Sequence, residues 1–573
     1  MRKIPIILAL LFFASLPASA TTYYVDNCVV VGNDSNNGTA TGTPWLTITK
    51  VNASTFAAGD SILFERTCIW YGVALTVPNS GTRGNPITFG AYGSGANPII
   101  KGATNINTSG YVLNSGATFT YVGALATTVV AAWENDNLIK LETSAALVEA
   151  HAGSWFSDGS NMYIHASDGS NVASNGKLYD YVDSSSPSFT MWDNAKNYLV
   201  INGIDQSETY NTSTGTLGGL YLTGSNSVVE NLSFHDHYRH GFCFYLTANN
   251  DVATNVTGYG SYGTAPVCIY GSGTTGNLLQ NSTLYNDTAL KEAYVGTGVW
   301  GVVVAHGGSN GNTVDSCLIY STAASPGGWG ITVGDANTTL TVSHSLIYGT
   351  FTNAVIVGAG GVGNTGSVKL FGNLIDISAA GSVGMLFTAS VGNVIFNNTI
   401  YGPSNTNPAI SQASTSTGAV VENNIFYTGA YASVDASSES STGYDYNDYF
   451  SASGTPFSWG GVAYNFADWQ TNSSEDADSV TSNPALVNAA PILSGGNYAL
   501  QNGSPMIDAG FDFGIPYNFE LMPSSTWPKG VAIGNQYNYV PPALRALALG
   551  WEIGAYIFPN AITTPSKLGV LLP

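Results

Sequence analysis

Charged side chains are scarce in this chain. Only 9% of its 573 residues are Asp, Glu, Lys or Arg, and Lys and Arg together number 15. The 36 acidic residues leave a formal net charge of −21. Nucleic-acid phosphates would repel such a chain, which argues against a nucleic-acid partner. The same charge disfavours acidic polysaccharides at long range, unless a local basic patch reverses the field.

Long apolar runs are missing after the amino-terminal region, where no stretch of about 20 apolar residues could span a bilayer. The chain opens on Met-Arg-Lys, followed by an apolar run over 4–16 and Ala-Ser-Ala at 18–20. A basic start, a short apolar core and small residues are typical of a secretory signal peptide. We therefore expect cleavage after Ala20, no membrane span, and a mature protein that is secreted or held at the cell surface.

Cysteine is rare as well, and five copies are an odd number for an exported chain. Cys28 and Cys68 could pair within the amino-terminal segment. Cys243 and Cys268 are one repeat apart, and neighbouring coils of about 4.8 Å spacing would bring them within disulfide reach. Two stacked free thiols fit this spacing equally well. Cys317 would remain unpaired.

The residues that are abundant favour strands and turns: glycine occurs 67 times and tyrosine 33 times, with many Asn, Ser and Thr. Between 231 and 427 a short pattern keeps returning, as in Asn-Ser-Thr-Leu-Tyr at 281–285 and Asn-Asn-Thr-Ile-Tyr at 397–401. Its copies end at positions 235, 259, 285, 320, 348, 376, 401 and 427, so the steps run from 24 to 35 residues. A β-rich repeat of this length is typical of a solenoid.

A second pattern runs through the same repeats, a Gly, Pro or Ala followed by apolar, any residue, apolar. Two patterns per repeat predict at least two parallel strands in each coil. Strand alternation would place Leu220, Leu222, Phe242, Phe244, Val302 and Val304 in the core. It would leave an outer row that is unusually apolar, and is therefore either covered or a contact surface. That row is Tyr221, Cys243, Cys268, Val303, Thr332, Ile356 and Leu386.

Asparagine opens many copies of the first pattern. We expect these asparagines to occupy one turn of every coil, with their amides stacked in a buried column that satisfies its own donors and acceptors. The members are Asn231, Asn255, Asn281, Asn397 and Asn423, and the column is interrupted at Ser316, His344 and Gly372.

The flanking segments depart from the repeat. Residues 44–56 fit an amphipathic helix with a proline at its start, which would cover the open end of the solenoid. Residues 111–186 contain short strand-like runs separated by Asp-Gly and Asn-Gly turns, which predict a small antiparallel β insert. The expected organisation is a signal peptide (1–20), a cap and first coils (21–110), the insert (111–186), the repeats (187–450), and a carboxy-terminal capping region with a tail (451–573).

Several phrases of the sequence carry a family resemblance. Tyr-Tyr-Val-Asp at 23–26, Ala-Gly-Asp-Ser-Ile-Leu-Phe at 58–64 and Asn-Pro-Ile-Thr-Phe-Gly-Ala-Tyr-Gly at 85–93 resemble the opening of exported right-handed parallel β-helix proteins. This is the pectate-lyase-like superfamily, and phrases near 503–510 and 552–556 resemble its carboxy-terminal part. The resemblance implies an all-β, right-handed parallel β-helix over nearly the whole mature chain. It implies no single activity, because such proteins include lyases, hydrolases and members with no assigned reaction.

One segment concentrates the scarce charge. Residues 235–240 hold three of the seven histidines together with an arginine and an aspartate. The longest loop, 285–300, lies two coils further on, or about 10 Å away. Cleaving a uronate polymer by β-elimination needs a cation for the carboxylate, a base and an acid. Arg239 suits the first role because its fork pairs with a carboxylate.

The remaining roles fall to neighbouring side chains. A histidine or lysine could be the base and a tyrosine the acid, while aromatic rings could stack on sugars. The catalytic candidates are His237, Arg239, His240 and Lys291, and the substrate-binding candidates are His235, Tyr221, Tyr238, Glu292, Tyr294 and Trp300. The alternative is a loop whose histidines merely pair with turns and water.

Hydrolysis of a glycosidic bond is the competing chemistry. It needs two carboxylates about 5–5.5 Å or 6.5–9.5 Å apart. Asp236 with Glu292, or Asp335 beside His306, could supply them. No carboxylate cluster in the sequence demands a metal, although Ca²⁺ bridges uronates in many lyases that this chain resembles.

We therefore favour a secreted carbohydrate-active protein, with a polysaccharide lyase ahead of a glycoside hydrolase if it is catalytic. The alternative is a non-catalytic extracellular protein that binds a polysaccharide, a cell-surface glycan or a partner through its apolar outer row.

Overall fold

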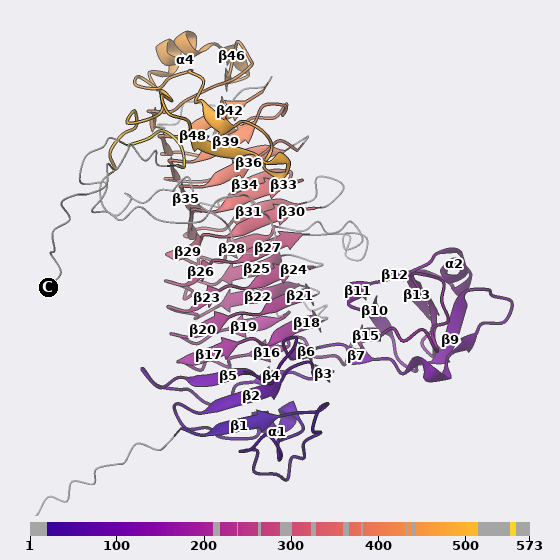
Figure 1. Cartoon of the computed structure of the whole chain (residues 1–573). Helices are drawn as coiled ribbons and strands as arrows, with labels where there is room; N and C mark the ends of the chain where they lie inside the picture. Colours follow the sequence, from indigo (N-terminus) through magenta and orange to yellow (C-terminus); the bar gives the residue numbers. More distant parts are fainter. Residues whose placement is uncertain are drawn as a thin grey trace, which may run out of the picture.

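The chain winds into a right-handed parallel β-helix, as its repeat predicts (Figure 1). The structure is a computed structural model that describes residues 20–209, 218–237, 239–261, 265–286, 301–322, 328–358, 366–379, 382–429, 434–436, 443–513 and 551–556. In this part of the chain each regular coil contributes one strand to each of three sheets, which we call A, B and C. The sequence indicated at least two strands per coil, and the structure adds a third.

Sheet A has 13 strands in the described residues: β1 (Thr22–Val25), β2 (Ser61–Glu65), β5 (Ile87–Tyr92), β17 (Leu199–Asn202), β20 (Val228–Glu230), β23 (Val252–Thr254), β26 (Leu278–Gln280), β29 (Asn312–Asp315), β32 (Thr339–Ser343), β35 (Ser367–Phe371), β38 (Val394–Phe396), β41 (Val420–Glu422) and β44 (Gly443–Asp445).

Sheet B follows sheet A around the coil, and its described strands are β3 (Ile69–Tyr71), β6 (Ile99–Lys101), β18 (Asp205–Thr209), β21 (Ser233–His237), β24 (Thr257–Tyr259), β27 (Thr283–Asn286), β30 (Leu318–Ser321), β33 (Leu346–Gly349), β36 (Leu374–Asp376), β39 (Thr399–Gly402) and β42 (Ile425–Thr428).

Sheet C completes each coil. Its described strands are β4 (Leu75–Thr76), β16 (Met191–Trp192), β19 (Leu220–Leu222), β22 (His240–Tyr245), β25 (Ala265–Tyr270), β28 (Val303–His306), β31 (Trp329–Val333), β34 (Asn353–Val357), β37 (Val383–Phe387), β40 (Ile410–Gln412), β43 (Val434–Ala436), β45 (Phe457–Trp459) and β46 (Val462–Tyr464).

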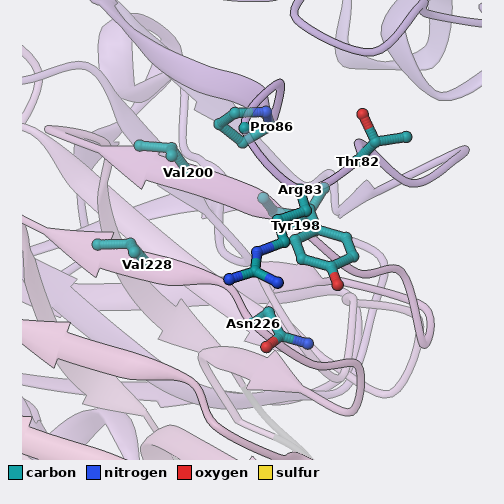
Figure 2. A pocket seen from close by; sticks show the side chains of 9 residues that line it. Thr82, Arg83, Pro86, Tyr198, Val200, Asn226 and Val228 are labelled. Atoms are coloured by element: carbon teal, nitrogen blue, oxygen red, sulfur yellow. The ribbon is translucent and has the colours of Figure 1, made fainter.

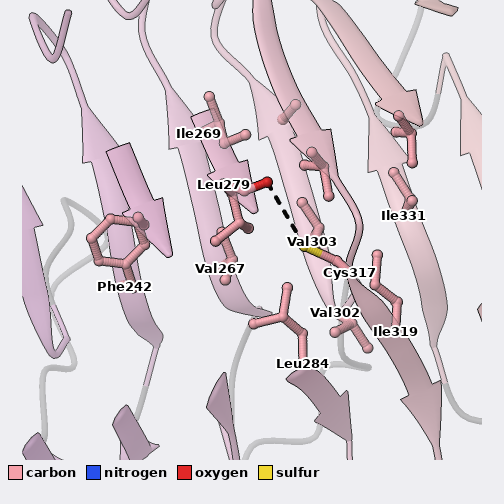
Figure 3. Packing of buried hydrophobic residues seen from close by; sticks show 14 of the residues in the cluster. Phe242, Val267, Ile269, Leu279, Leu284, Val302, Val303, Cys317, Ile319 and Ile331 are labelled. Carbon is pink, nitrogen blue, oxygen red and sulfur yellow. Dashed lines mark hydrogen bonds between the residues drawn. The ribbon is translucent and has the colours of Figure 1, made fainter. Parts of the chain in front are cut away.

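Side chains from all three sheets fill the interior of the solenoid (Figure 3). Leu220, Leu222, Phe242 and Phe244 are buried there as predicted. The prediction for Val304 is wrong, because β28 begins at Val303 and its register pairs Val304 with Cys268 on the outer face. Val303 and Ala305 therefore enter the core, and Val302 joins them from outside the strand.

Most of the apolar outer row of sheet C is covered. Tyr221, Cys243, Cys268, Thr332 and Ile356 are all buried, and Leu386 is half-buried. Tyr221, Cys243 and Cys268 form a small cluster of their own on this face. The row is therefore not available as an open contact surface.

The corner between sheets A and B is held by one left-handed residue in each coil. Asn231, Asn255, Asn281, Asn397 and Asn423 all have φ between 49° and 59°. Asparagine tolerates this region because its short side chain bonds locally. Ser316, His344 and Gly372 take the same conformation, so they continue the turn rather than interrupt it.

The amide column differs in part from the prediction. Asn231 and Asn281 are exposed and Asn255 is half-buried, whereas Asn397 and Asn423 are buried. The fully buried column in the later coils is formed by the residues next to the left-handed ones. There Asn373 donates to Asn398, Asn398 to Asn424, and Asn424 to Asn447, at 2.9–3.1 Å.

The amino-terminal end is closed by a short helix, α1 (Ile48–Asn52). It is shorter than the segment expected from the pattern, and it starts after the cap residue Thr47 rather than at the proline. Trp45, Ile48, Val51 and Phe56 nevertheless pack into the solenoid core. The predicted cap is thus confirmed.

The insert projects from the side of the solenoid beside β3, β6 and β18 (Figure 1). Its strands and one helix are β7 (Thr104–Asn105), β8 (Val112–Leu113), β9 (Thr120–Ala124), β10 (Val129–Glu134), β11 (Asn137–Leu138), β12 (Lys140–Leu141), α2 (Ala145–Ala150), β13 (Ser154–Ser157), β14 (Asn161–His165) and β15 (Tyr179–Asp183). They form a four-stranded and a five-stranded sheet that are almost entirely antiparallel.

The carboxy-terminal region covers the other end of the helix and the outer face of late sheet B. Trp469 of α4 (Phe466–Ser473) enters the solenoid core. β47 (Leu486–Asn488) and β48 (Asn497–Leu500) contribute to an apolar cluster with Tyr348 and Tyr401. No helix in the described residues is long and apolar enough to cross a membrane.

Both proposed cysteine pairs are disulfides. Cys28 bonds to Cys68, and Cys243 bonds to Cys268 in the next coil with a Cα–Cα distance of 4.5 Å. Cys317 is free and buried, and its thiol lies 3.7 Å from the carbonyl oxygen of Leu279 (Figure 3).

The corner that precedes the sheet A strand in each coil contains a buried carboxyl group whose protonation affects stability. Asp251, Asn277 and Asn312 stack there: Asn277 accepts from the Asp251 backbone, and it donates to Asn312. The Oδ2 atom of Asp251 is buried without a hydrogen-bond partner in the described residues. Burial raises the pKa of Asp251 to about 8.

We expect Asp251→Asn to stabilise the protein increasingly as pH rises. The folded state keeps this proton up to about pH 8, whereas the unfolded chain releases it near pH 4. The wild type therefore loses about 1.4 kcal/mol of unfolding free energy per pH unit between these values through this group. Urea unfolding of both proteins at about pH 5 and about pH 8 measures the effect. A variant-minus-wild-type difference that does not change with pH would contradict it.

Candidate active site

Two acidic residues occupy equivalent positions near the carboxy-terminal ends of strands β18 and β21 of sheet B. The register of β18 and β21 pairs Ser207 with His235 and Thr209 with His237. The residues between them, Glu208 and Asp236, have φ of 57° and 58°. Each strand is therefore locally kinked at an acidic residue, one coil above the other.

Lys101 of β6 lies at the centre of an ion cluster around Glu208. Its Nζ atom is 2.9 Å from Oε1 of Glu208 and 2.7 Å from Oδ2 of Asp180, and it also contacts Asp136. Lys101, Asp180 and Glu208 are almost completely buried, whereas the Asp136 side chain is 48% exposed. Three carboxylates thus share one buried cation.

The insert supplies two of these carboxylates. Asp180 lies on β15, and Asp136 lies in the two-residue turn between β10 and β11. Asn135 and Asp136 both have positive φ, as this kind of hairpin turn requires. The insert is therefore placed so that its hairpin tip meets the solenoid at Lys101 and Glu208.

The carboxyl groups of Glu208 and Asp136 have opposite shifts in pKa. Burial raises the pKa of Glu208 well above its usual value, although Lys101 opposes the shift. Burial also acts to raise the pKa of Asp136, but the charge of Lys101 and hydrogen bonds with Lys101 and Glu208 outweigh it and lower the pKa. The protonated form is therefore favoured more at Glu208 than at Asp136.

The three carboxyl groups lie close together. Oxygen atoms of Asp136, Asp180 and Glu208 all lie within 4.8 Å of one another. The second oxygen of Glu208, Oε2, is buried and accepts no hydrogen bond in the described residues, which is costly for an ionised carboxylate. Protonation of Glu208 would lower this cost, because a neutral carboxyl group is less costly to bury than an ionised one.

The same three oxygens could also hold a metal ion, since Ca²⁺ prefers carboxylate ligands. The ammonium group of Lys101 already occupies the space between them and neutralises part of their charge. A second group with suitable spacing, Asp26, Cys28 and Cys68, includes both cysteines of a disulfide. A role for Ca²⁺ therefore stays a prediction of the sequence.

The predicted histidines lie beside this cluster. Nδ1 of His235 is 2.7 Å from Oδ2 of Asp236, and the charge of His235 helps to lower the pKa of Asp136. His237 is fully buried, its Nδ1 is 2.9 Å from the hydroxyl of Thr209, and burial lowers its pKa to about 3. His237 is therefore neutral at neutral pH.

Arg239 directly precedes strand β22 of sheet C, and His240 is the first residue of that strand. Burial lowers the pKa of His240 to about 3, and the charges of His306 and Arg239 add to the effect. Burial and Arg239 also lower the pKa of His306, against the opposing charge of Asp335, whose Oδ2 is 3.6 Å from the His306 ring. Arg239, His240 and His306 thus form one electrostatic group.

Other candidates are placed differently or lie outside the described residues. Tyr221 is fully buried, with its ring 5.4 Å from that of Tyr245, so it presents no open platform for sugars. Five candidates lie outside the described residues: Tyr238, Lys291, Glu292, Tyr294 and Trp300. The Asp236–Glu292 pair is therefore untested.

A column of stacked rings leads away from the acidic cluster along the outer face of sheet B. His235 stacks on Tyr259 at a centroid distance of 4.8 Å, and the stack continues through Tyr285, Tyr320 and Tyr348 at 4.8–5.1 Å. Tyr259, Tyr285 and Tyr320 are half-buried, and Tyr348 is buried in the carboxy-terminal cluster. The column therefore joins the acidic cluster to the carboxy-terminal region.

Sequence reasoning missed Lys101, Asp136, Asp180 and Glu208. A usable signal existed for Glu208, because it precedes Asp236 by 28 residues, one repeat, in a chain poor in charge. No such signal existed for the two residues of the insert, since their place depends on how the insert docks. Lys101 and Glu208 are 107 residues apart in the sequence.

Comparisons with known proteins agree with the fold. No family model matches the chain. A lacto-N-biosidase of Bifidobacterium longum subsp. longum is 38% identical over 92 residues, which cover 15% of this chain and 6% of that protein. The chain thus spans only a small part of this curated relative.

Among solved structures, a complex of XylC with xylose has a TM-score of 0.53 and 15% identity, over 71% of this chain and 76% of that one. Pectate lyase Pel9A has a TM-score of 0.38 and 13% identity, over 90% of this chain and 96% of that one. The chain is a parallel β-helix protein, and its structural neighbours include polysaccharide lyases, an epimerase and glycoside hydrolases.

The ion cluster predicts a large effect on stability. We expect Lys101→Met to lower the unfolding free energy by about 3–5 kcal/mol, because it leaves buried carboxylates without their cation. Lys140→Met is the matched control, since Lys140 pairs with Glu142 while 48% exposed and should change stability by less than about 1 kcal/mol. Urea unfolding measures the free energy of unfolding of both variants. Equal losses in the two variants would contradict a stabilising role of the buried ion cluster around Lys101.

Proposed function

We propose that this protein is a glycoside hydrolase that cleaves its substrate at the Glu208–Asp136 pair. The observation that carries the proposal is two neighbouring carboxyl groups whose pKa values are shifted in opposite directions. Such a pair provides an acid and an ionised partner at the same pH. The oxygen separation of 4.8 Å or less fits the short spacing of retaining enzymes better than the wide spacing of inverting ones.

The residues then have distinct roles. Glu208 gives its proton to the glycosidic oxygen as the bond to the anomeric carbon breaks, and the Asp136 carboxylate forms a bond to that carbon. Glu208, now ionised, takes a proton from water, whose oxygen displaces Asp136 and releases the sugar.

Lys101 and Asp180 act as positioning residues. Lys101 holds Asp136 ionised, and Asp180 adds negative charge that favours the protonated form of Glu208. With Glu208 protonated, the carboxylates of Asp136 and Asp180 still outnumber the single ammonium group of Lys101, so the cluster is negatively charged and repels a uronate. The substrate proposed for this site is therefore a neutral glycan of an extracellular or cell-surface polymer. The sugar ligand of XylC and the partial match to a lacto-N-biosidase support a carbohydrate substrate.

β-Elimination is the second candidate. The observation that favours it is the grouping of Arg239 with His240 and His306, which would place a guanidinium next to possible bases. Their lowered pKa values make both histidines weak bases at neutral pH, so this chemistry has less support than hydrolysis.

We expect Glu208→Gln and Asp136→Asn each to lower the release of reducing sugar ends by at least about 100-fold, the usual scale for a catalytic acid or base. Asp158→Asn, the same chemical change at an exposed turn of the insert, is the control and should retain activity. Thermal unfolding of each variant shows that folding is intact. Full activity in either site variant would contradict the catalytic roles of Glu208 and Asp136.

Wild-type activity should follow a bell-shaped pH profile. It should fall at low pH as Asp136 becomes protonated and at high pH as Glu208 loses its proton. Reducing ends released from a panel of neutral polysaccharides across the pH range measure it. A profile that only rises with pH would contradict the assignment of Glu208 as the acid.

The same panel, extended to uronate polymers, separates the candidates. Elimination produces unsaturated ends that absorb in the ultraviolet, and it should be lost in Arg239→Ala and unaffected by Glu208→Gln. Glycan binding with no product of either kind would indicate the non-catalytic alternative.

A further inference from the structure

The corner before sheet A contains one residue that departs from its neighbours. The strand register aligns position 198 with a left-handed residue in six other coils, whereas Thr339 and Ser367 take this position in two further coils without positive φ. Those six are asparagine or glycine: Asn226, Asn250, Gly276, Gly311, Gly392 and Gly418. Tyr198 has the same conformation, with φ of 57°.

A bulky residue is unfavourable in this region, where its Cβ crowds the backbone. Asparagine and glycine serve the turn in the neighbouring coils, so the turn itself does not require a tyrosine. Unfavourable backbone conformations persist where the side chain has another use.

Tyr198 lines a surface pocket of about 510 Å³. Arg83 enters it from the tight turn that the Thr82–Asn85 bridge closes, and Asn226 enters from the next coil. In Figure 2 the guanidinium of Arg83 and the amide of Asn226 lie together beside the Tyr198 ring. Pro86, Val200 and Val228 give the pocket an apolar part.

The size and lining suit one or two sugar rings, because small-molecule pockets start at about 300 Å³. A tyrosine ring and aliphatic side chains can pack against the C–H groups of a sugar. An amide can bond to hydroxyl groups, and a guanidinium pairs with a carboxylate through two parallel hydrogen bonds. Arg83 is exposed and is one of few basic residues in a strongly acidic chain, so the pocket is a local positive site.

We propose that the pocket formed by Arg83, Tyr198 and Asn226 binds a uronate residue of an acidic glycan. The pocket lies beside strands β17 and β20 of sheet A, whereas the acidic cluster lies near the carboxy-terminal ends of β18 and β21 of sheet B. The protein thus holds a carboxylated sugar at one face and cleaves neutral linkages at another. The binding site does not depend on the catalytic proposal.

Isothermal titration of the full-length protein with trigalacturonate, and with the neutral trisaccharide galactotriose, tests the site. We expect measurable binding of trigalacturonate, binding at least tenfold weaker for galactotriose, and an affinity that falls as salt is added. Arg83→Ala should weaken trigalacturonate binding at least tenfold, and Arg83→Lys should restore part of it.

Two further variants separate binding from folding. Lys369→Ala removes a positive charge from the same sheet, six strands away, and should leave binding unchanged. Tyr198→Asn restores the residue type of the next coils, so it should maintain or raise the melting temperature while weakening binding. Equal binding of both trisaccharides, unchanged affinity in Arg83→Ala, or equal affinity for inorganic phosphate would each overturn the proposal, as would the absence of binding at millimolar ligand.

Discussion

The left-handed corner between sheets A and B is the constraint on which the structure depends. Every coil must leave sheet A and enter sheet B at the same place, or the three sheets could not stack in register. In the described repeats from Asn231 onward this reversal is made by one residue with positive φ, most often asparagine, and elsewhere by serine, histidine, glycine or, at Tyr446, tyrosine. The repeat in the sequence records this position more than any other.

Function, as we propose it, occupies places where the regular coil is modified. Glu208 and Asp236 add a second left-handed residue near the end of a sheet B strand, and in the next coil the aligned left-handed residue is Gly260. Tyr198 keeps the regular backbone but replaces a small residue with a large one. The insert is the largest modification, and its hairpin tip delivers Asp136 to the solenoid. The scaffold is rigid, so each change positions a side chain without disturbing the stack.

The fold could be predicted from the sequence because its main constraints are local and repeated. The repeat length, the corner asparagines, the cap and both disulfide pairs all follow from residues within one or two coils. The third sheet was missed because its strands are as short as the three residues Val228–Glu230, although an apolar residue such as Val229 stands two positions before each corner residue. The exchange of Val303 and Val304 was missed because the start of β28 shifts by one residue, which inverts the alternation.

The candidate site could be predicted only in part, since it depends on long-range docking. The sequence pointed to the charged segment 235–240, and His235 and Asp236 do lie beside the acidic cluster. The cluster itself combines β6, β18 and two elements of the insert, and no spacing rule links them. The proposed chemistry requires that Glu208 keeps its proton at neutral pH. Infrared difference spectra of wild type and Glu208→Gln near pH 7 are the decisive test of that requirement. We expect a protonated-carboxyl band in the wild type that the variant lacks, and identical spectra in this region would contradict the protonation of Glu208.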